Sequence, residues 1–287
     1  MTPPILKHAG DLLARYDVIF CDVWGVIHDG LKAFPLACDA LSRFRAGGGT
    51  VVLVSNAPVP QEQVERMLVS RAVMPSAYDA IVSSGDIALA HIQSAGFQSV
   101  YCIGPRDRDS ALFDKLTAKQ VELAEAEAIV CSGFTDDRTE TAESYRALLE
   151  TALKRSLPFV CANPDLVVDV GGKLYLCAGA IADLYAHMGG EVFWAGKPHA
   201  SAYGTALEVA QRLRGADVPA SRILGIGDAL RTDLKAAQGA GVDGLFIAGG
   251  IHRHDAMTGQ EIDAGKLAKL FAGSGIPAIG AMAYLAW

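Results

Sequence analysis

The sequence predicts an α/β fold built on a parallel sheet. Along the 287 residues, short and almost continuously apolar runs alternate with longer segments of helical periodicity. Strands that are apolar on both faces are typical of parallel sheets covered by helices on both sides. A chain of this length forms one large or two moderate domains.

The elements follow one another as strand and helix from the N-terminal region onward. Short apolar runs rich in Val, Ile, Phe and Cys are predicted strands at 17–22, 50–54, 80–83, 99–103, 128–132, 158–161, 192–194, 222–226 and 243–247. The segments between them carry helical patterns at 36–47, 60–71, 86–95, 109–116, 141–155, 178–188, 199–213 and 231–239. Clusters of Gly and polar residues predict loops at 47–49, 104–109, 169–173, 189–191 and 248–250.

Composition narrows the class of protein. Hydrophobic residues make up 51% and charged residues 20% of the chain, which is typical of a globular protein and not of a disordered one. The net charge is -7 and no run of Lys or Arg is present, so we expect no nucleic-acid partner. No stretch approaches the ~18 apolar residues of a membrane span, and the first residues lack the apolar core of a signal peptide. The six cysteines form no CxxC pair, which favours buried reduced thiols in a cytoplasmic protein without membrane contact.

Polar side chains follow four of the predicted strands. In open parallel sheets, ligands bind in the crevice beyond the carboxyl ends of the strands. We therefore expect these side chains to converge on one crevice, although their strands are far apart in the chain. They are Asp22 at the end of the first strand, Ser55 and Asn56 after the second, Lys197 after 192–194, and Asp228 with Asp233 after 222–226.

This mixture of carboxylates, a hydroxyl and an ammonium suits phosphoryl transfer. A carboxylate can act as a nucleophile and form an aspartyl-phosphate. Asp22 and Asp228 supply the oxygen ligands that Mg²⁺ prefers, and Lys197 adds positive charge where the transition state is negative. Each residue alone is more typical of a turn, a helix cap or a solvated loop. Only their joint order indicates the chemistry.

That order resembles the haloacid dehalogenase (HAD) superfamily. Its four motifs correspond to "FCDVWGV" (20–26), "VVLVSN" (51–56), "GKP" (196–198) and "LGIGDALRTD" (224–233). The stretches "VYCIG" (100–104), "ANPD" (162–165) and "CAGAIADLY" (177–185) are similar to segments of class IIA nucleotide, nitrophenyl, phosphoglycolate and pyridoxal phosphatases. The resemblance implies a Rossmann-like core at 1–84 and 191–287, with an inserted α/β cap of the class IIA type at 85–190.

The resemblance also implies a role for each motif residue in hydrolysis of a small phosphorylated metabolite, such as a sugar phosphate or a nucleotide. Asp22 would be the nucleophile. The Mg²⁺ ligands would be Asp22, Asp228, the backbone carbonyl of Trp24, and Asp233, which would hold metal-bound water or orient Lys197. The phosphoryl group would be bound by Ser55, Asn56, Gly25 and Lys197. Asn163 and Asp165 would contact substrate from the cap, with a plain Asn-Pro-Asp turn as the alternative.

Trp24 departs from the family pattern. In the family's phosphatases this position, two residues after the nucleophile, holds a second aspartate that serves as general acid and base. Indole donates a hydrogen bond but cannot exchange a proton usefully, so we expect slow turnover or a leaving group that needs no protonation. His28 and Asp29 lie just downstream as replacements, His28 being the sharper hypothesis because it titrates near neutral pH. A structural role for both is favoured.

Three functions stay open. The first is a phosphatase acting through Asp22, the second a phosphate-binding or regulatory protein with weakened turnover, and the third dehalogenation or phosphonate cleavage at the same aspartate. The stretch "GGIHRHD" (249–255) could bind a metal or an anionic substrate, although a solvated loop is favoured. Relatives often dimerise through the cap, so a homodimer is also open.

Overall fold

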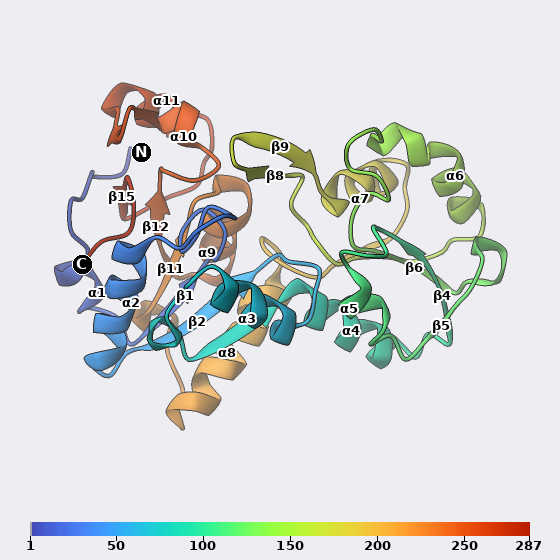
Figure 1. Ribbon diagram of the computed structural model, residues 1–287, viewed down its shortest axis with the longest axis horizontal. Coiled ribbons are helices and arrows are strands. Elements are labelled where there is room, and N and C mark those ends of the chain that lie inside the picture. The colour runs from blue at the N-terminus through green and yellow to red at the C-terminus, as the bar shows by residue number, and fades with distance from the viewer. Residues whose placement is uncertain (1) are drawn as a thin grey trace. The chain divides into compact units, whose positions relative to one another are not determined.

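The computed structural model describes residues 2–287 and divides them into two compact units (Figure 1). The first unit contains the residues up to Ser55, Glu65–Val82 and Lys197–Trp287. The second contains Asn56–Val64 and Ser83–Gly196. Each unit is built around its own sheet.

The sheet of the first unit has six strands in the order β15-β12-β11-β1-β2-β3. β1 pairs in parallel with β2 on one side and with β11 on the other, while β12 pairs in parallel with β11 and β15. After β1 the chain adds β2 and β3 on one side of β1, and it later adds β11, β12 and β15 on the other side. The strand order therefore reverses between β1 and β11, and ligands bind at such a reversal in parallel sheets. The strands are β1 (Val18–Cys21), β2 (Thr50–Ser55), β3 (Ala80–Ser83), β11 (Ile223–Gly227), β12 (Asp243–Ile247) and β15 (Gly280–Met282).

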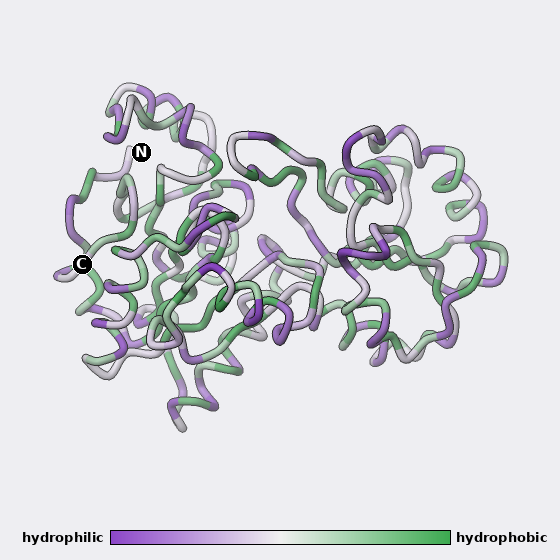
Figure 2. Tube along the Cα trace, in the orientation of Figure 1, coloured by the Kyte–Doolittle hydropathy of each residue, from purple (hydrophilic) through white to green (hydrophobic). Residues whose placement is uncertain are grey.

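Burial on both faces explains these strands. All residues of β1 and β11 are buried, and so are all but the last of β2. Figure 2 shows the same strand segments in the colour of hydrophobic residues. The surrounding elements are α1 (Gly10–Leu13), α2 (Pro35–Ala46), α3 (Gln61–Ser70), η1 (Pro75–Ala77), α8 (Ala200–Arg214), η4 (Ala220–Arg222), the π-helical turn η5 (Leu230–Leu234), α9 (Lys235–Ala240), α10 (Arg253–Ala256), β13 (Met257–Thr258), β14 (Glu261–Ile262) and α11 (Ala264–Ala272).

The second unit has a five-stranded parallel sheet in the order β10-β7-β6-β4-β5. A separate antiparallel hairpin is formed by β8 and β9. Phe134, Phe159 and Tyr185 are among the largest fully buried side chains of its core. Its elements are α4 (Ser84–Ala95), β4 (Ser99–Ile103), α5 (Ser110–Phe113), β5 (Lys119–Gln120), η2 (Leu123–Glu125), β6 (Ala128–Cys131), η3 (Ala142–Tyr145), α6 (Arg146–Lys154), β7 (Phe159–Cys161), β8 (Val167–Val170), β9 (Lys173–Leu176), α7 (Ala178–His187) and β10 (Val192–Trp194).

The predicted α/β class and all predicted strands are confirmed, with ends that differ by one residue at most. The prediction of a loop at 169–173 is wrong at both ends, because residues 169 and 170 belong to β8 and residue 173 belongs to β9. Only Gly171 and Gly172 form the turn, with φ of 63° and 86°, as a two-residue hairpin turn of type I′ requires. The sequence prediction also missed α11, whose start is capped by the Asp263 carboxylate, and the edge strand β15.

None of the helices within residues 2–287 combines the length and the hydrophobicity that a membrane-spanning helix requires.

Candidate active site

The carboxyl ends of β1 and β11 place two aspartates side by side. Cys21 is in register with Ile226, and the backbone N–H of Asp22 donates to the carbonyl of Ile226 at 2.8 Å. Asp228 follows Ile226 by two residues on the neighbouring strand end. Two carboxylates that lie far apart in the chain thus meet at one sheet edge.

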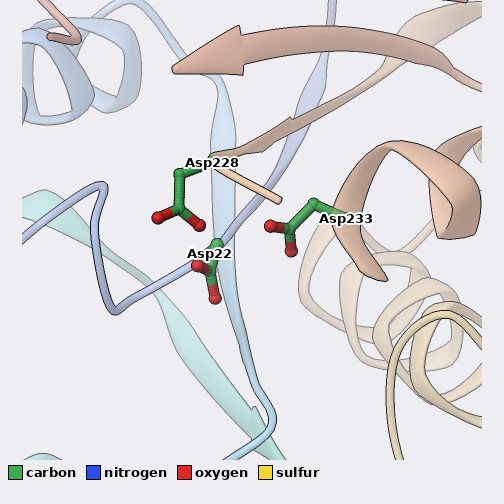
Figure 3. Close-up of side chains that lie close together, drawn as sticks. All are labelled: Asp22, Asp228 and Asp233. Atoms are coloured by element: carbon green, nitrogen blue, oxygen red, sulfur yellow. The ribbon is translucent and has the colours of Figure 1, made fainter. Parts of the chain in front are cut away.

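A third carboxylate completes the cluster. Oxygen atoms of Asp22, Asp228 and Asp233 all lie within 4.8 Å of one another. Figure 3 shows the three side chains converging on one space. Asp228 and Asp233 are buried, and Asp22 is partly exposed. The sequence prediction that these three residues meet therefore agrees with the geometry of the described residues.

Lys197 bridges two of these carboxylates. Its Nζ atom lies 2.6 Å from Oδ1 of Asp22 and 2.7 Å from Oδ1 of Asp233. Burial by itself lowers the pKa of Lys197, but the two carboxylates outweigh it and raise the pKa well above its usual value. The ammonium is therefore a fixed positive charge beside the predicted nucleophile.

Asp233 reaches the cluster from a π-helical turn. In η5 the N–H groups of Asp233 and Leu234 both point to the carbonyl of Ala229, and Oδ2 of Asp233 accepts the N–H of Ala229 at 3.0 Å. Gly227 makes room for this return, because an added Cβ would lie 2.1 Å from Cβ of Asp233. Single π-helical turns of this kind are frequent at functional sites. The predicted helix at 231–239 is thus partly a π turn.

Asp228 is enclosed by two glycines. An added Cβ would lie 2.0 Å from its Oδ2 at Gly25 and 1.8 Å from it at Gly250. Gly25 also has a φ of +80°, a conformation that other residues rarely adopt. The same Oδ2 accepts the N–H of Ile251 at 2.7 Å. Both glycines therefore let the backbone close around this carboxylate.

Burial raises the pKa of Asp228 well above its usual value, and the charges of Asp22 and Asp233 raise it further. Three carboxylates with one ammonium leave this cluster short of positive charge. A hard divalent cation prefers such carboxylate oxygens. The residues present therefore fit a divalent cation, which Asp22, Asp228 and Asp233 would hold.

Ser55 ends β2 at the same sheet edge, two residues beyond Leu53, the partner of Cys21. Ser55 is therefore placed next to the strand end that carries Asp22. This is the position from which the sequence analysis expects a contact to a phosphoryl group, and that contact stays a prediction.

Trp24 packs its indole on the loop that follows β1. The ring lies 5.1 Å from that of His28 in an edge-on arrangement, and an added Cβ at Gly30 would meet the indole at 2.3 Å. Nδ1 of His28 accepts the N–H of Gly30 at 2.9 Å, so the ring proton belongs on Nε2, a buried atom. Burial, with help from Arg71, lowers the pKa of His28 to about 4. His28 is thus a neutral, packed side chain, which supports the structural role.

The remaining predicted contact residues lie in the second unit. Asn56 donates from Nδ2 to Oδ1 of Asp165 at 2.8 Å, and Oδ1 of Asn163 accepts the N–H of Asp165 at 3.1 Å. The second bond is the Asn-Pro-Asp turn that the sequence analysis gave as the alternative. A substrate contact of these three residues stays a prediction.

Three contributors to the site were not assigned to it from the sequence, although two of them lie in the stretch 249–255 that was considered for binding a metal or an anion. Gly250 and Ile251 enclose Asp228 from the loop after β12, and the hydroxyl of Tyr203 in α8 lies against Gly225 of β11. The Tyr203 ring packs edge-on against Phe20 at 5.0 Å, and burial followed by the nearby Asp233 carboxylate raises its pKa. The glycine pair "GG" (249–250) was visible in the sequence, but only the fold shows which carboxylate it faces.

This combination places the chain in the class of α/β proteins that carry a carboxylate cluster at the carboxyl edge of a parallel sheet. The family model described as haloacid dehalogenase-like hydrolase matches residues 19–119, and one described as HAD-hydrolase-like matches residues 194–270. A solved haloacid dehalogenase-like hydrolase from Brucella suis 1330 is 42% identical, with 98% of this chain and 100% of that chain covered and a TM-score of 0.85. The chain belongs to the haloacid dehalogenase-like hydrolase family.

Two further relatives agree with this assignment. The 5'-nucleotidase YutF of Bacillus subtilis is 26% identical over 249 residues, which is 86% of this chain and 92% of that protein. A p-nitrophenyl phosphatase from Archaeoglobus fulgidus is 19% identical, with 94% and 96% of the two chains covered and a TM-score of 0.70, and it shows the same fold.

Proposed function

We propose that this protein is a Mg²⁺-dependent phosphatase of small phosphorylated metabolites, a sugar phosphate or a nucleotide, that acts through an aspartyl-phosphate on Asp22. The observation that carries the proposal is the contact of Lys197 with Asp22 at 2.6 Å beside two further carboxylates. This contact places the nucleophilic carboxylate of Asp22 beside a fixed positive charge. The neighbouring carboxylates supply oxygen ligands for a divalent cation.

In this reaction a carboxylate oxygen of Asp22 attacks phosphorus, and the bond between phosphorus and the ester oxygen breaks. The ester oxygen leaves with the bonding electron pair and takes its proton from water, because Trp24 has none to give. Lys197 stabilises the negative charge that spreads over the phosphoryl oxygens, and Ser55 donates to one of them. Water then attacks the aspartyl-phosphate, which releases inorganic phosphate and restores Asp22. Bound Mg²⁺ would screen the repulsion between the anionic nucleophile and the anionic ester.

The proposed division of labour assigns residues 1–84 and 191–287 to the catalytic core and 85–190 to a cap that supplies specificity. We place the protein in the cytoplasm, since its six cysteines are all free and buried, as is usual in a reducing compartment. The name of the B. subtilis relative supports nucleotides among the substrates to be tested.

The proposal is tested with p-nitrophenyl phosphate and a panel of sugar phosphates and nucleotides, with Mg²⁺ and with EDTA. We expect Mg²⁺-dependent phosphate release that Asp22→Asn abolishes. Asp11→Asn, in the exposed first turn of α1, is the matched control and should keep full activity. Release that is independent of metal, or that survives in Asp22→Asn, would overturn the proposal.

Trp24 favours a second candidate, a phosphate-binding protein that has lost efficient turnover. Its indole, which packs against Gly30, stands in place of the general acid expected at position 24, and His28 is neutral and buried. If the wild type binds phosphate esters by calorimetry without hydrolysing them, while Trp24→Asp hydrolyses them, this second function is the correct one.

A further inference from the structure

The loop after β12 runs directly against the acidic cluster. The N–H of Ile251 donates to Oδ2 of Asp228 at 2.7 Å, and Gly250 is so close that an added Cβ would lie 2.4 Å from Cγ of Asp228. The backbone at these two residues is thus fixed to a predicted metal ligand. The residues directly after Ile251 therefore start beside the site.

Three basic side chains follow at once: His252, Arg253 and His254. The N–H of Arg253 donates to the carbonyl of Gly250 at 3.0 Å, which closes a turn whose ends lie within about 7 Å of each other. The Cα atom of Arg253 is therefore one turn away from the residue that touches Asp228. A long arginine side chain starting there can reach a ligand held at the cluster.

The charged groups near Arg253 pair with other residues, so its guanidinium is free to bind a ligand. His252 is paired with Asp255 at 3.5 Å, and Lys266 donates to the carbonyls of Met257 and His254. Arg253 and His254 are exposed, and among residues 2–287 no ion pair or side-chain hydrogen bond engages the guanidinium of Arg253. The stretch therefore presents a cation to solvent next to the site.

The reacting phosphoryl group does not need this cation. Lys197 already contacts Asp22 and Asp233, and Asp228 accepts the backbone N–H of Ile251 and would be a ligand of the metal. A second cation outside this set is placed to bind a different part of the substrate. Arginine binds carboxylates and phosphates through two parallel hydrogen bonds.

We propose that Arg253, with His254 beside it, binds a second anionic group of the substrate, so that the protein prefers phosphate monoesters that carry a further carboxylate or phosphate a few bonds from the ester. This inference rests on the proposed phosphatase function and names its substrate class. Charge complementarity, and not shape, is the basis of the preference.

Three esters with the same leaving-group carbon chain test the preference. They are n-propyl phosphate, 3-(phosphonooxy)propanoate and propane-1,3-diol bisphosphate, and the last two separate a carboxylate from a phosphate. We expect the wild type to have a kcat/KM about 10-fold or more higher for at least one anionic ester than for propyl phosphate, the effect of one charge-assisted hydrogen bond. In Arg253→Gln this ratio should fall to about 1.

Charge reversal adds a readout that a structural role would not move. In Arg253→Glu, 3-aminopropyl phosphate should be preferred over 3-(phosphonooxy)propanoate. Arg212→Gln, in the exposed last turn of α8, is the matched control and should keep the wild-type ratio. Equal kcat/KM values for all esters in the wild type, or a ratio that survives in Arg253→Gln, would overturn the inference while leaving the phosphatase function intact.

If no ester is hydrolysed, the proposed function fails and binding decides the inference. Calorimetry with Mg²⁺ then compares 3-(phosphonooxy)propanoate with propyl phosphate. Tighter binding of the anionic ester that is lost in Arg253→Gln supports the inference, and equal binding of the two esters refutes it.

Discussion

The Nζ atom of Lys197 lies 2.6 Å from Oδ1 of Asp22, although 175 positions separate the two residues in the chain. Lys197 is 2% exposed, and its second contact is Oδ1 of Asp233 at 2.7 Å. The positive charge is thus held in place by two negative charges, one of which is the predicted nucleophile. This arrangement ties stability and catalysis to the same ion pair.

Replacing Lys197 by Met should therefore damage both properties. Two carboxylates would be left close together without their cation, and breaking a buried pair in this way costs about 3–5 kcal/mol of unfolding free energy. Loss of the charge at the phosphoryl group should lower kcat by about 10²–10³-fold. Urea unfolding and steady-state kinetics measure the two effects.

Lys269→Met, in the last turn of α11, is the control and should change neither quantity appreciably. The double variant Lys197→Met/Asp233→Asn should regain part of the stability but none of the activity, because it removes one of the stranded charges. Full activity in Lys197→Met would contradict the assigned role.

Gly250→Ala should weaken metal binding with little effect on the rest of the fold. The new Cβ would lie 1.8 Å from Oδ2 of Asp228, and this carboxylate is only 5% exposed, so it cannot move aside freely. A displacement of about 1 Å in an active site can cost 10²-fold in rate. We expect a loss of this size in kcat/KM, and a smaller rise in Tm on adding Mg²⁺ than the wild type shows.

Gly239→Ala in α9 is the matched control, because an added Cβ there meets nothing within 4 Å. It should increase the unfolding free energy by about 0.5–1 kcal/mol, as Ala for Gly does inside a helix. A normal metal response in Gly250→Ala would show that the loop tolerates the methyl group.

Asp228→Asn should stabilise the metal-free protein. Burial and two neighbouring carboxylates oppose a charge at this position, as its raised pKa indicates, and an amide oxygen can still accept the N–H of Ile251. Without metal we expect a gain of about 0.5–2 kcal/mol in unfolding free energy, the usual size for relief of a strained functional site. With Mg²⁺ the order should reverse, since only the wild type gains stability from the ion.

Asp233→Asn provides the contrast in urea unfolding with EDTA. Asp233 is paired with Lys197 and accepts the N–H of Ala229, so its neutralisation should destabilise the protein. If both variants destabilise the metal-free protein equally, the cluster is not short of positive charge as described.

The pairing of β1 with β11 should depend on pH through Asp17 and Arg222. The guanidinium of Arg222 donates to both carboxylate oxygens of Asp17 at 2.9 and 2.7 Å, just before the two strands begin. These hydrogen bonds lower the pKa of Asp17 below its usual value. Its stabilisation is therefore present above the unfolded-state pKa, about 3.9, and is lost as pH falls through the lower folded-state pKa.

Urea unfolding of wild type and Asp17→Asn from pH 7 down to pH 3 measures this contribution. The difference between them should be small, because the pair is exposed to solvent, and should shrink toward pH 3 and in high salt. A difference that grows as pH falls would contradict the assignment.

The strands and the Asp22, Asp228 and Asp233 cluster were predictable because their signals are local. A buried parallel strand is a short apolar run, and a ligand site lies where such runs end in polar residues. The enclosure of Asp228 by Gly25 and Gly250 was not predictable, since a glycine shows no sign of the distant side chain that it faces. The hairpin of β8 and β9 was missed for a related reason. The residues of β8 are half buried and the first two of β9 are exposed, so the hairpin carries no continuous buried apolar run.

Trp24→Asp should raise kcat/KM much more for substrates with a poor leaving group than for substrates with a good one. An aspartate at this position can protonate the leaving oxygen, and such help is worth about 10²–10⁴-fold. Nitrophenolate needs little protonation, whereas an alkoxide needs it. The ratio of kcat/KM for an alkyl phosphate to that for p-nitrophenyl phosphate should therefore rise by about 10²-fold or more in this variant.

Trp24→Asn is the matched control, because it has nearly the same shape as Trp24→Asp but cannot exchange a proton. Both variants lose the packing of the indole on His28 and Gly30, so both should unfold at lower urea concentration than the wild type. Only the aspartate should raise the ratio. If the wild type already hydrolyses alkyl phosphates faster than p-nitrophenyl phosphate, a proton donor other than the residue at position 24 is at work.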